Sequence, residues 1–307
     1  MNYTLNQLRV YTQVVHDKSI TKAALTLHLS QPAVSIQLKN FTSQFDIPLI
    51  EIINKRICIT DFGKEIAEAA HVILNEIEAI EHKMHAYQGL LTGKLKLSIV
   101  STGKYIAPYF IAEFIEQHPG IELSIDVTNK TQVIESLDNN VVDFSLVSIL
   151  PKDNKYLKVE LMPNNLYLVG GAKNQWDKKI HGNEIFKQIQ LIYREIGSGT
   201  REVMEHYITK HKLPVIKKME LKSNEAVKQA VMAGLGYSIM PIIGIKNEIN
   251  NAQLHIIPVK GFPIQSTWNL ICLKNKTLSP VAQAFLNFIK KEKQRIIQEK
   301  FNENDVL

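Results

Sequence analysis

Cysteine is almost absent from this 307-residue sequence, which contains only Cys58 and Cys272. Two cysteines so far apart provide neither a disulfide framework nor the close spacing of a metal site. Disulfide-rich and zinc-finger classes of protein are therefore excluded. A redox-sensing pair of thiols stays open as an alternative.

Long apolar runs are also missing. The longest uncharged stretch, 229–245, contains three glycines and a proline and is shorter than the ~20 apolar residues that a bilayer span requires. At the amino terminus, Asn2, Gln7 and Arg9 interrupt apolar residues at helical spacing, whereas a secretory signal has a basic start and a continuous apolar run. We expect no membrane contact and no export, and hence a cytoplasmic protein.

No charge of one sign dominates the sequence. Lysine and arginine number 36 and aspartate and glutamate 30, which gives a net charge of +6. This mild basicity permits nucleic-acid binding without establishing it. The hydrophobic fraction of 45% is that of ordinary globular proteins, and the length suits one small domain plus one of about 200 residues.

Three short helical patterns and one hairpin pattern occupy the first 60 residues. Ser19 and Ser30 are suitable N-caps for the second and third helices, and Pro32 falls in the first turn of the third, where its missing N–H costs nothing. Residues 49–60 alternate β-branched residues around a polar break, which predicts a small hairpin with a basic tip. The second and third helices, with a tight connection between them, have the geometry that places a helix in the DNA major groove. An ordinary helix bundle with a solvated face is the alternative.

Polar and basic residues on these elements are candidate DNA contacts. Glutamine can bond adenine edges, serine reaches bases or phosphates, and lysine and arginine neutralise phosphates. The candidates from the residues alone are Lys22, Gln31, Ser35, Gln37, Lys39, Lys55 and Arg56.

A long helical pattern begins at Thr60, a suitable N-cap, and continues to about Leu91. A helix of this length is a rod of roughly 45 Å, and its single apolar stripe needs a partner, which a second copy of the chain would provide. The residues that we expect in this dimer interface are Phe62, Ile66, Ile73, Ile77, Ile80 and Met84.

The remaining two thirds of the chain alternate strands with helices. This βαβ rhythm, in about 95–149 and again in 191–240, predicts parallel sheets in two α/β subdomains. Strand-like segments at 166–170 and 268–273 are suited to carry the chain from one subdomain to the other and back. A closing helix over 280–300 is expected to pack on the first subdomain.

A glycine-rich segment, 197–201, follows a predicted strand and begins a predicted helix. Backbone N–H groups at such a helix start can cradle an anion, although the same residues can simply begin a helix. Residues 101–103 and Ser148 also follow strands, and ligands of open α/β sheets bind at the carboxyl ends of strands. We therefore predict an effector cleft between the subdomains, with Gly236 and Tyr237 on its far wall. The full candidate set is Ser101, Thr102, Ser148, Gly197, Ser198, Gly199, Thr200, Arg201, Gly236 and Tyr237.

Known catalytic and cofactor motifs are not found. The segment 197–199 is not the nucleophile elbow of hydrolases, 234–236 lacks the third glycine of a dinucleotide fingerprint, and no Walker-type motif occurs. His82 and His85 lie near two glutamates at a spacing open to metal ligation, but a solvated face of the long helix explains them more simply. We expect no enzyme, no cofactor and no metal.

Two segments carry a family resemblance: "SITKAALTLHLSQPAVSIQLKNF" and "KRICITDFG" resemble the signature of LysR-type transcriptional regulators. Further segments, "VSTGKY", "GSGTR", "SNEAVKQAVMAGLGYS", "GFPI" and "LSPVAQAFLNFI", are similar to the branch that controls carbon-fixation (Rubisco) operons. The resemblance implies a winged helix-turn-helix over 1–60, a linker helix over 61–91 and an effector-binding regulatory domain over 94–307. It also implies that this domain is periplasmic-binding-protein-like (type 2), with two Rossmann-like subdomains, 94–165 plus 269–307 and 166–268.

The resemblance also implies how such a protein works. Gln31, Pro32 and Ser35 would contact promoter DNA, and 55–56 would form a wing in the minor groove. A homodimer, further paired into a homotetramer, would change its arrangement on DNA when a small anionic metabolite binds, and would act on RNA polymerase. An alternative is a solute-binding protein that uses only the α/β part, but this leaves the first ninety residues unexplained.

Several positions depart from the family pattern. Ile50 and Ile52 stand where a phenylalanine and often an arginine are usual, and 41–42 replace a common Leu-Glu pair. After the Phe-Pro-Ile segment, 265–267 are polar where the carbon-fixation branch tends to have basic residues. Apolar bulk is kept at the first positions, so we expect the fold to be retained, whereas the ligand of that branch does not transfer directly.

Overall fold

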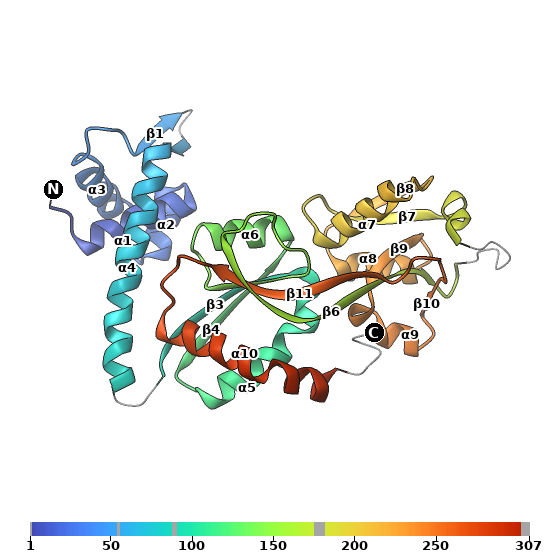
Figure 1. The fold of residues 1–307 in the computed structure, drawn as a ribbon. Coiled ribbons are helices and arrows are strands. Elements are labelled where there is room, and N and C mark those ends of the chain that lie inside the picture. The colour runs from blue at the N-terminus through green and yellow to red at the C-terminus, as the bar shows by residue number, and fades with distance from the viewer. Residues whose placement is uncertain (1, 54–55, 88–90, 175–181, 302–307) are drawn as a thin grey trace. The chain divides into compact units, whose positions relative to one another are not determined.

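The computed structural model describes residues 2–53, 56–87, 91–174 and 182–301, and the chain divides into two compact units, Met1–Leu90 and Leu91–Leu307 (Figure 1). Among the described residues, no helix combines the length and apolarity needed to cross a membrane. Each unit has its own hydrophobic core, so each is described separately.

The first unit contains three short helices, a hairpin and one long helix. Its elements are α1 (Leu5–Asp17), α2 (Ile20–Thr26), α3 (Gln31–Thr42), β1 (Ile50–Ile53), β2 (Arg56–Ile59) and α4 (Asp61–Tyr87). The predicted caps are confirmed: the hydroxyls of Ser19 and Ser30 accept backbone N–H bonds at the starts of α2 and α3. Thr60 accepts one from Gly63 at 2.9 Å, which fixes the start of α4.

The core of the first unit joins all its helices. Tyr11 and Phe41 are fully buried there, and the Tyr11 hydroxyl donates to the Gly63 carbonyl at 2.7 Å. A Cβ at Gly63 would lie 2.1 Å from the Leu49 carbonyl oxygen, so only glycine allows α4 to begin this close to the hairpin. Along α1, Leu5 is exposed while Leu8, Tyr11 and Val14 are buried. The buried face is turned toward Val14 because α1 packs against α3 and α4 together.

The second unit is an α/β body. Its elements in chain order are β3 (Gly93–Val100), the 3-10 helix η1 (Ser101–Tyr105), α5 (Ala107–Gln117), β4 (Ile121–Thr128), α6 (Lys130–Asp138), β5 (Phe144–Val147), β6 (Tyr156–Gly171), η2 (Gly182–Lys187), β7 (Gln190–Arg194), α7 (Gly199–Lys210), β8 (Ile216–Leu221), α8 (Asn224–Met232), β9 (Tyr237–Pro241), η3 (Ile242–Gly244), α9 (Lys246–Asn250), β10 (Leu254–Ile256), β11 (Ile264–Leu273) and α10 (Pro280–Lys300).

One sheet runs through this unit in the order β4-β3-β5-β11-β6-β9-β7-β8, with β10 paired to β6. Strand β3 pairs in parallel with β4 and β5, and β7 pairs in parallel with β8 and β9. The antiparallel strands β6 and β11 lie between these two groups, as Figure 1 shows, with β11 next to β5 and β6 next to β9. The fold class predicted from the sequence, two α/β subdomains joined by crossing strands, is confirmed.

The two crossing strands are longer than the sequence predicted. The segments 166–170 and 268–273 are only parts of β6 and β11. The pairing register of the two strands shifts between Thr267 and Asn269, next to the buried Trp268, which belongs to the core around β3–β5. Each strand therefore contributes residues first to one core and then to another. For this reason the apolar residues of β6 and β11 do not follow one pattern along the whole strand.

The hydrophobic cores define the subdomains. One core combines β3, β5, α5 and α10, so the closing helix packs on the first subdomain as expected. Two further cores lie around β7 and β9, one containing Tyr207 of α7 and the other Val231 of α8. Helices cover the sheet in both groups, and the loops after the strands are left to form a site.

Candidate functional site

The exposed face of α3 carries the predicted base-reading residues. Val34, Leu38 and Phe41 are buried and hold α3 on the other helices. The opposite face leaves four of the candidates exposed and Gln37 half-buried; the four are Gln31, Pro32, Ser35 and Lys39. The structure thus presents polar side chains along an exposed face of α3 that includes its amino-terminal turn, as a groove-reading helix requires.

The neighbouring elements extend this face. The Gln31 amide donates to the Thr21 hydroxyl of α2, and Lys22 is exposed on the same short helix. Arg56 is exposed at the start of β2, whereas Lys55 lies outside the described residues. Polar side chains of α2 and α3 therefore lie together, and a cation begins the second strand of the hairpin.

The departures from the family pattern leave the fold intact. Ile50 packs against the core of the first unit, and Phe41 is buried at its centre. Ile52 is exposed on β1, so no packing is lost by its presence.

The expected dimer stripe on α4 divides into two parts. Phe62 and Ile66 pack against the core of their own unit. Ile73 and Ile80 are exposed and Ile77 is half-buried; the side chain of Met84 lies outside the described residues, as do those of His82 and His85. The α4 helix also packs on this core through Ala70 and Leu74, whereas Ile73 and Ile80 are presented to solvent.

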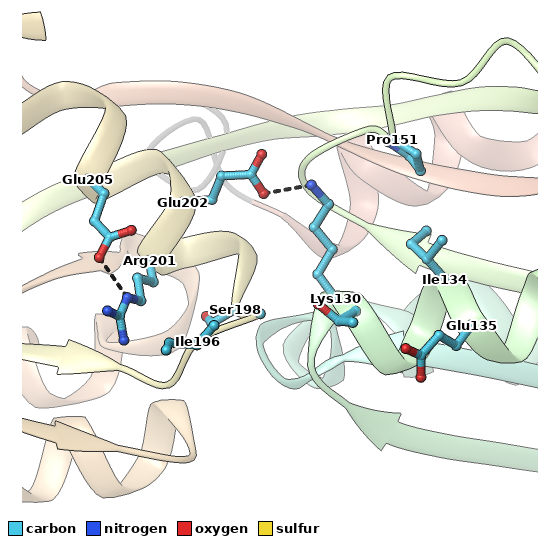
Figure 2. A pocket seen from close by; sticks show the side chains of 11 residues that line it. Lys130, Ile134, Glu135, Pro151, Ile196, Ser198, Arg201, Glu202 and Glu205 are labelled. Atoms are coloured by element: carbon cyan, nitrogen blue, oxygen red, sulfur yellow. Dashed lines mark hydrogen bonds and ion pairs between the residues drawn. The ribbon is translucent and has the colours of Figure 1, made fainter. Parts of the chain in front are cut away.

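A cavity of about 700 Å³ lies between the starts of α6 and α7 in the second unit. Figure 2 shows Lys130 of α6 reaching toward Glu202 of α7 across it. The Lys130 ammonium lies 2.6 Å from the Glu202 carboxylate, and the Thr131 N–H donates to the Gly197 carbonyl at 3.3 Å. These two bonds connect the first subdomain to the second.

Several predicted effector residues meet at this cavity. Gly197, Ser198 and Arg201 line it, and a Cβ at Gly199 would lie 3.8 Å from the Ser148 hydroxyl. Thr200 is buried in the first turn of α7. Segments that are far apart in the sequence thus converge, because each follows a strand of the same sheet.

Gly197 is required by its conformation. Its φ is +87°, in the left-handed region that favours glycine. A Cβ there would lie 2.7 Å from the Thr131 hydroxyl oxygen. The backbone of the two subdomains can approach this closely only because the side chain is missing.

Arg201 is already paired. Its guanidinium bonds Glu205 at 2.7 Å, Glu220 at 2.6 Å and the Arg194 carbonyl at 3.0 Å. Burial by itself would lower the pKa of Arg201, but the hydrogen bonds to the two carboxylates outweigh it and raise the pKa. The cation is therefore shared with two carboxylates of its own subdomain and is not an isolated anion receptor.

Ser101 and Thr102 lie at a different junction. The Ser101 hydroxyl accepts from the Asn224 N–H of α8 at 3.5 Å, and Thr102 is buried. The nearby Tyr105 hydroxyl donates to Glu225 at 3.3 Å. These residues join η1 to the start of α8 and are not among the residues that line the cavity of Figure 2.

The expectation that Gly236 and Tyr237 line the far wall is corrected by the strand register. Tyr237 pairs with Leu191 in parallel, at the start of β7, whereas the cavity follows the end of β7. A Cβ at Gly236 would lie 2.7 Å from the Gln190 carbonyl oxygen, which also places it at the beginning of that strand. Parallel strands begin at the same edge of a sheet, so these two residues lie at the edge remote from the cavity.

Residues of α6 that line the cavity, among them Lys130 and Thr131, were not predicted from the sequence. The sequence did contain a sign of this helix start: Asn129 follows β4 and caps α6 by accepting a hydrogen bond from the Gln132 N–H. The alternative of redox sensing by cysteine is disfavoured at Cys272. Burial raises the pKa of its thiol, which disfavours the thiolate that redox sensing requires.

Two family models match this chain. Residues 5–64 match the bacterial regulatory helix-turn-helix protein model of the lysR family, and residues 88–294 match the LysR substrate binding domain. The chain belongs to the LysR family of transcriptional regulators. The helix-turn-helix match removes the solute-binding alternative, which left the first ninety residues unexplained.

Curated relatives place the chain near regulators of carbon fixation. It is 36% identical over 290 residues to the transcriptional activator CmpR of Synechocystis sp. PCC 6803, covering 94% of this chain and 95% of the relative. It is 34% identical over 301 residues to the RuBisCO operon transcriptional regulator of Allochromatium vinosum, with coverage of 96% and 98%. The resemblance inferred from the sequence motifs is confirmed.

Solved structures agree on the fold. The regulatory domain of CcmR from Synechocystis PCC 6803, in complex with 2-PG, is 32% identical with a TM-score of 0.60 and covers 64% of this chain and 96% of that one. A full-length variant of OxyR from Pseudomonas aeruginosa is 19% identical with a TM-score of 0.71 and covers 97% and 95%. The second likeness concerns the fold alone.

Proposed function

We propose that this regulator binds promoter DNA through α3 and the β1–β2 wing, and that a small anionic metabolite controls it from the cavity between α6 and α7. In this proposal residues 1–60 are the DNA-binding domain, 61–91 the linker helix and 94–307 the regulatory domain. The observation that carries it is that Thr131, Gly197 and Ser198 line one cavity. Gly199 lies next to Ser148 at the same helix start.

The chemistry of the cavity suits an anion. The starts of α6 and α7 both contribute to its lining, and helix starts favour negative charge through their N–H groups and dipoles. The Ser198 side chain makes no capping bond to α7, so its hydroxyl is available to a ligand in the first turn. Lys130 adds a cation.

A phosphorylated carboxylate is the ligand class that we propose. The 32% identical CcmR domain was solved with 2-PG, 2-phosphoglycolate. An anion bound between the helix starts would compete with the bonds Lys130–Glu202 and Thr131–Gly197 and change how the two subdomains are held. Such a ligand shifts the population between two arrangements of the oligomer, and with it the bending of promoter DNA.

The DNA contacts follow from the exposed face of α3 and its neighbours. Gln31, Pro32, Ser35 and Gln37 would read or approach bases, and the cations would neutralise phosphates; the cations are Lys22, Lys39, Lys55 and Arg56. Two copies joined along α4 through Ile73, Ile77 and Ile80, with Phe62, Ile66 and Met84 at its flanks, would read an inverted repeat. Pairing of two dimers into a tetramer, contact with RNA polymerase and action in the cytoplasm complete the proposal.

The test of the effector site is a titration of the full chain with 2-phosphoglycolate, followed by thermal unfolding. A ligand of the folded state stabilises it by mass action, by about 2.7 kcal/mol at a hundred times its Kd. We expect this stabilisation to be lost in Ser198→Ala while specific DNA binding is retained. An unchanged response of that variant would place the ligand elsewhere.

The test of the DNA role is a gel shift with the upstream intergenic DNA and with random DNA of equal length. We expect binding to the first at moderate salt and weaker binding to the second. A folded protein that binds neither would refute the DNA-binding proposal.

A further inference from the structure

The centre of the exposed face of α3 is apolar. The buried residues Val34, Leu38 and Phe41 fix which side of the helix faces the core. With about 100° between successive residues, the side opposite this core falls on Ile36, whose side chain is 57% exposed. An isoleucine thus occupies the side of this helix opposite its buried residues.

The residues around Ile36 make its position informative. Pro32 lies one turn earlier and is also exposed, so two apolar side chains stand in line at the i, i+4 spacing. Exposed Ser35 and Lys39 flank them on the same face. Single exposed apolar residues are ordinary on protein surfaces, but this pair lies along the middle of a face whose other members are suited to nucleic acid.

The chemistry of the major groove specifies what such a pair can recognise. Base edges there present hydrogen-bond donors and acceptors, which isoleucine cannot engage, and one apolar group, the 5-methyl of thymine. We propose that Ile36 is a specificity-determining residue that reads thymine through this methyl group, with Pro32 beside it. The inference depends on the proposed docking of α3 in the major groove.

The experiment removes the two methyl-bearing partners separately. Preferred sites are first selected from a random DNA library with the full chain. Each thymine of the selected half-site is then replaced by deoxyuridine, which lacks only the 5-methyl group. Dissociation constants are measured by fluorescence anisotropy for the wild type and for Ile36→Ala.

The expected result is a coupling between one or two thymines and Ile36. Deletion of a buried methyl corresponds to about a fourfold weaker Kd for the wild type. The Ile36→Ala variant should show no further loss at the same thymines, and Ile36→Val should keep part of the dependence. Because Ile36 is exposed and alanine favours helices, the variant should fold, which circular dichroism checks.

Ile47 provides the matched control. It is 55% exposed in the same unit but lies outside α3. Ile47→Ala should keep the thymine dependence of the wild type. If Ile36→Ala loses as much as the wild type at every deoxyuridine, or if no thymine matters to either protein, the inference is overturned. Failure of the wild type to prefer any DNA would instead refute the docking of α3.

Discussion

Replacing Glu202 by glutamine should tighten the binding of an anionic effector. In the structure the Glu202 carboxylate holds Lys130 at 2.6 Å, with the two side chains 53% and 16% exposed. An anion in the cavity has to share Lys130 with this carboxylate and lies close to its negative charge. Glutamine keeps the size of the side chain and removes the charge.

The size of the effect follows from two contributions. A partly exposed ion pair contributes about 0.2–1 kcal/mol, which the ligand no longer has to displace. Repulsion between two unit charges about 4 Å apart costs about 1 kcal/mol in a water-like surrounding. Together they amount to roughly 1–2 kcal/mol, or a Kd about five to thirty times smaller.

Isothermal titration calorimetry with 2-phosphoglycolate measures this change. Glu116→Gln is the matched control, because it removes the same charge from α5, outside the residues that line the cavity. Lys130→Gln should change the affinity in the opposite direction. If Glu202→Gln binds the ligand with unchanged or lower affinity while Lys130→Gln is also unaffected, the anion is not held at Lys130.

Three further outcomes are expected. Ile80, 65% exposed on α4, should be part of the dimer interface, so Ile80→Asp should yield a smaller species in sedimentation equilibrium; an unchanged mass would assign the interface elsewhere. Gly197→Ala should lower the free energy of unfolding by about 1–2 kcal/mol in denaturant titrations, because a side chain at this φ is strained, and it should also blunt the effector response; a stability equal to the wild type would contradict the required contact with Thr131. Gln31→Ala should reduce the preference for specific over random DNA by about 1–3 kcal/mol in competition binding, and equal losses on both DNAs would exclude base reading.

Local signals in the sequence were sufficient for much of the fold. Ser19 and Ser30 cap the helices that they were expected to cap, because an N-cap depends on the side chain and on backbone N–H groups only two or three residues away. The alternation of strands and helices likewise gave the α/β class, since hydrophobic periodicity is set by neighbours along the chain. The glycine-rich start of α7 could be found for the same reason.

The tertiary structure alone decided which of these signals meet. Tyr237 could be assigned to a strand from its neighbours, but only the parallel pairing with Leu191 shows that it lies at the remote edge of the sheet. Arg201 has one partner four residues away and another, Glu220, nineteen residues away on β8. The bond between Lys130 and Glu202 spans 72 residues. Such contacts depend on strand order and register, which periodicity within one element does not encode.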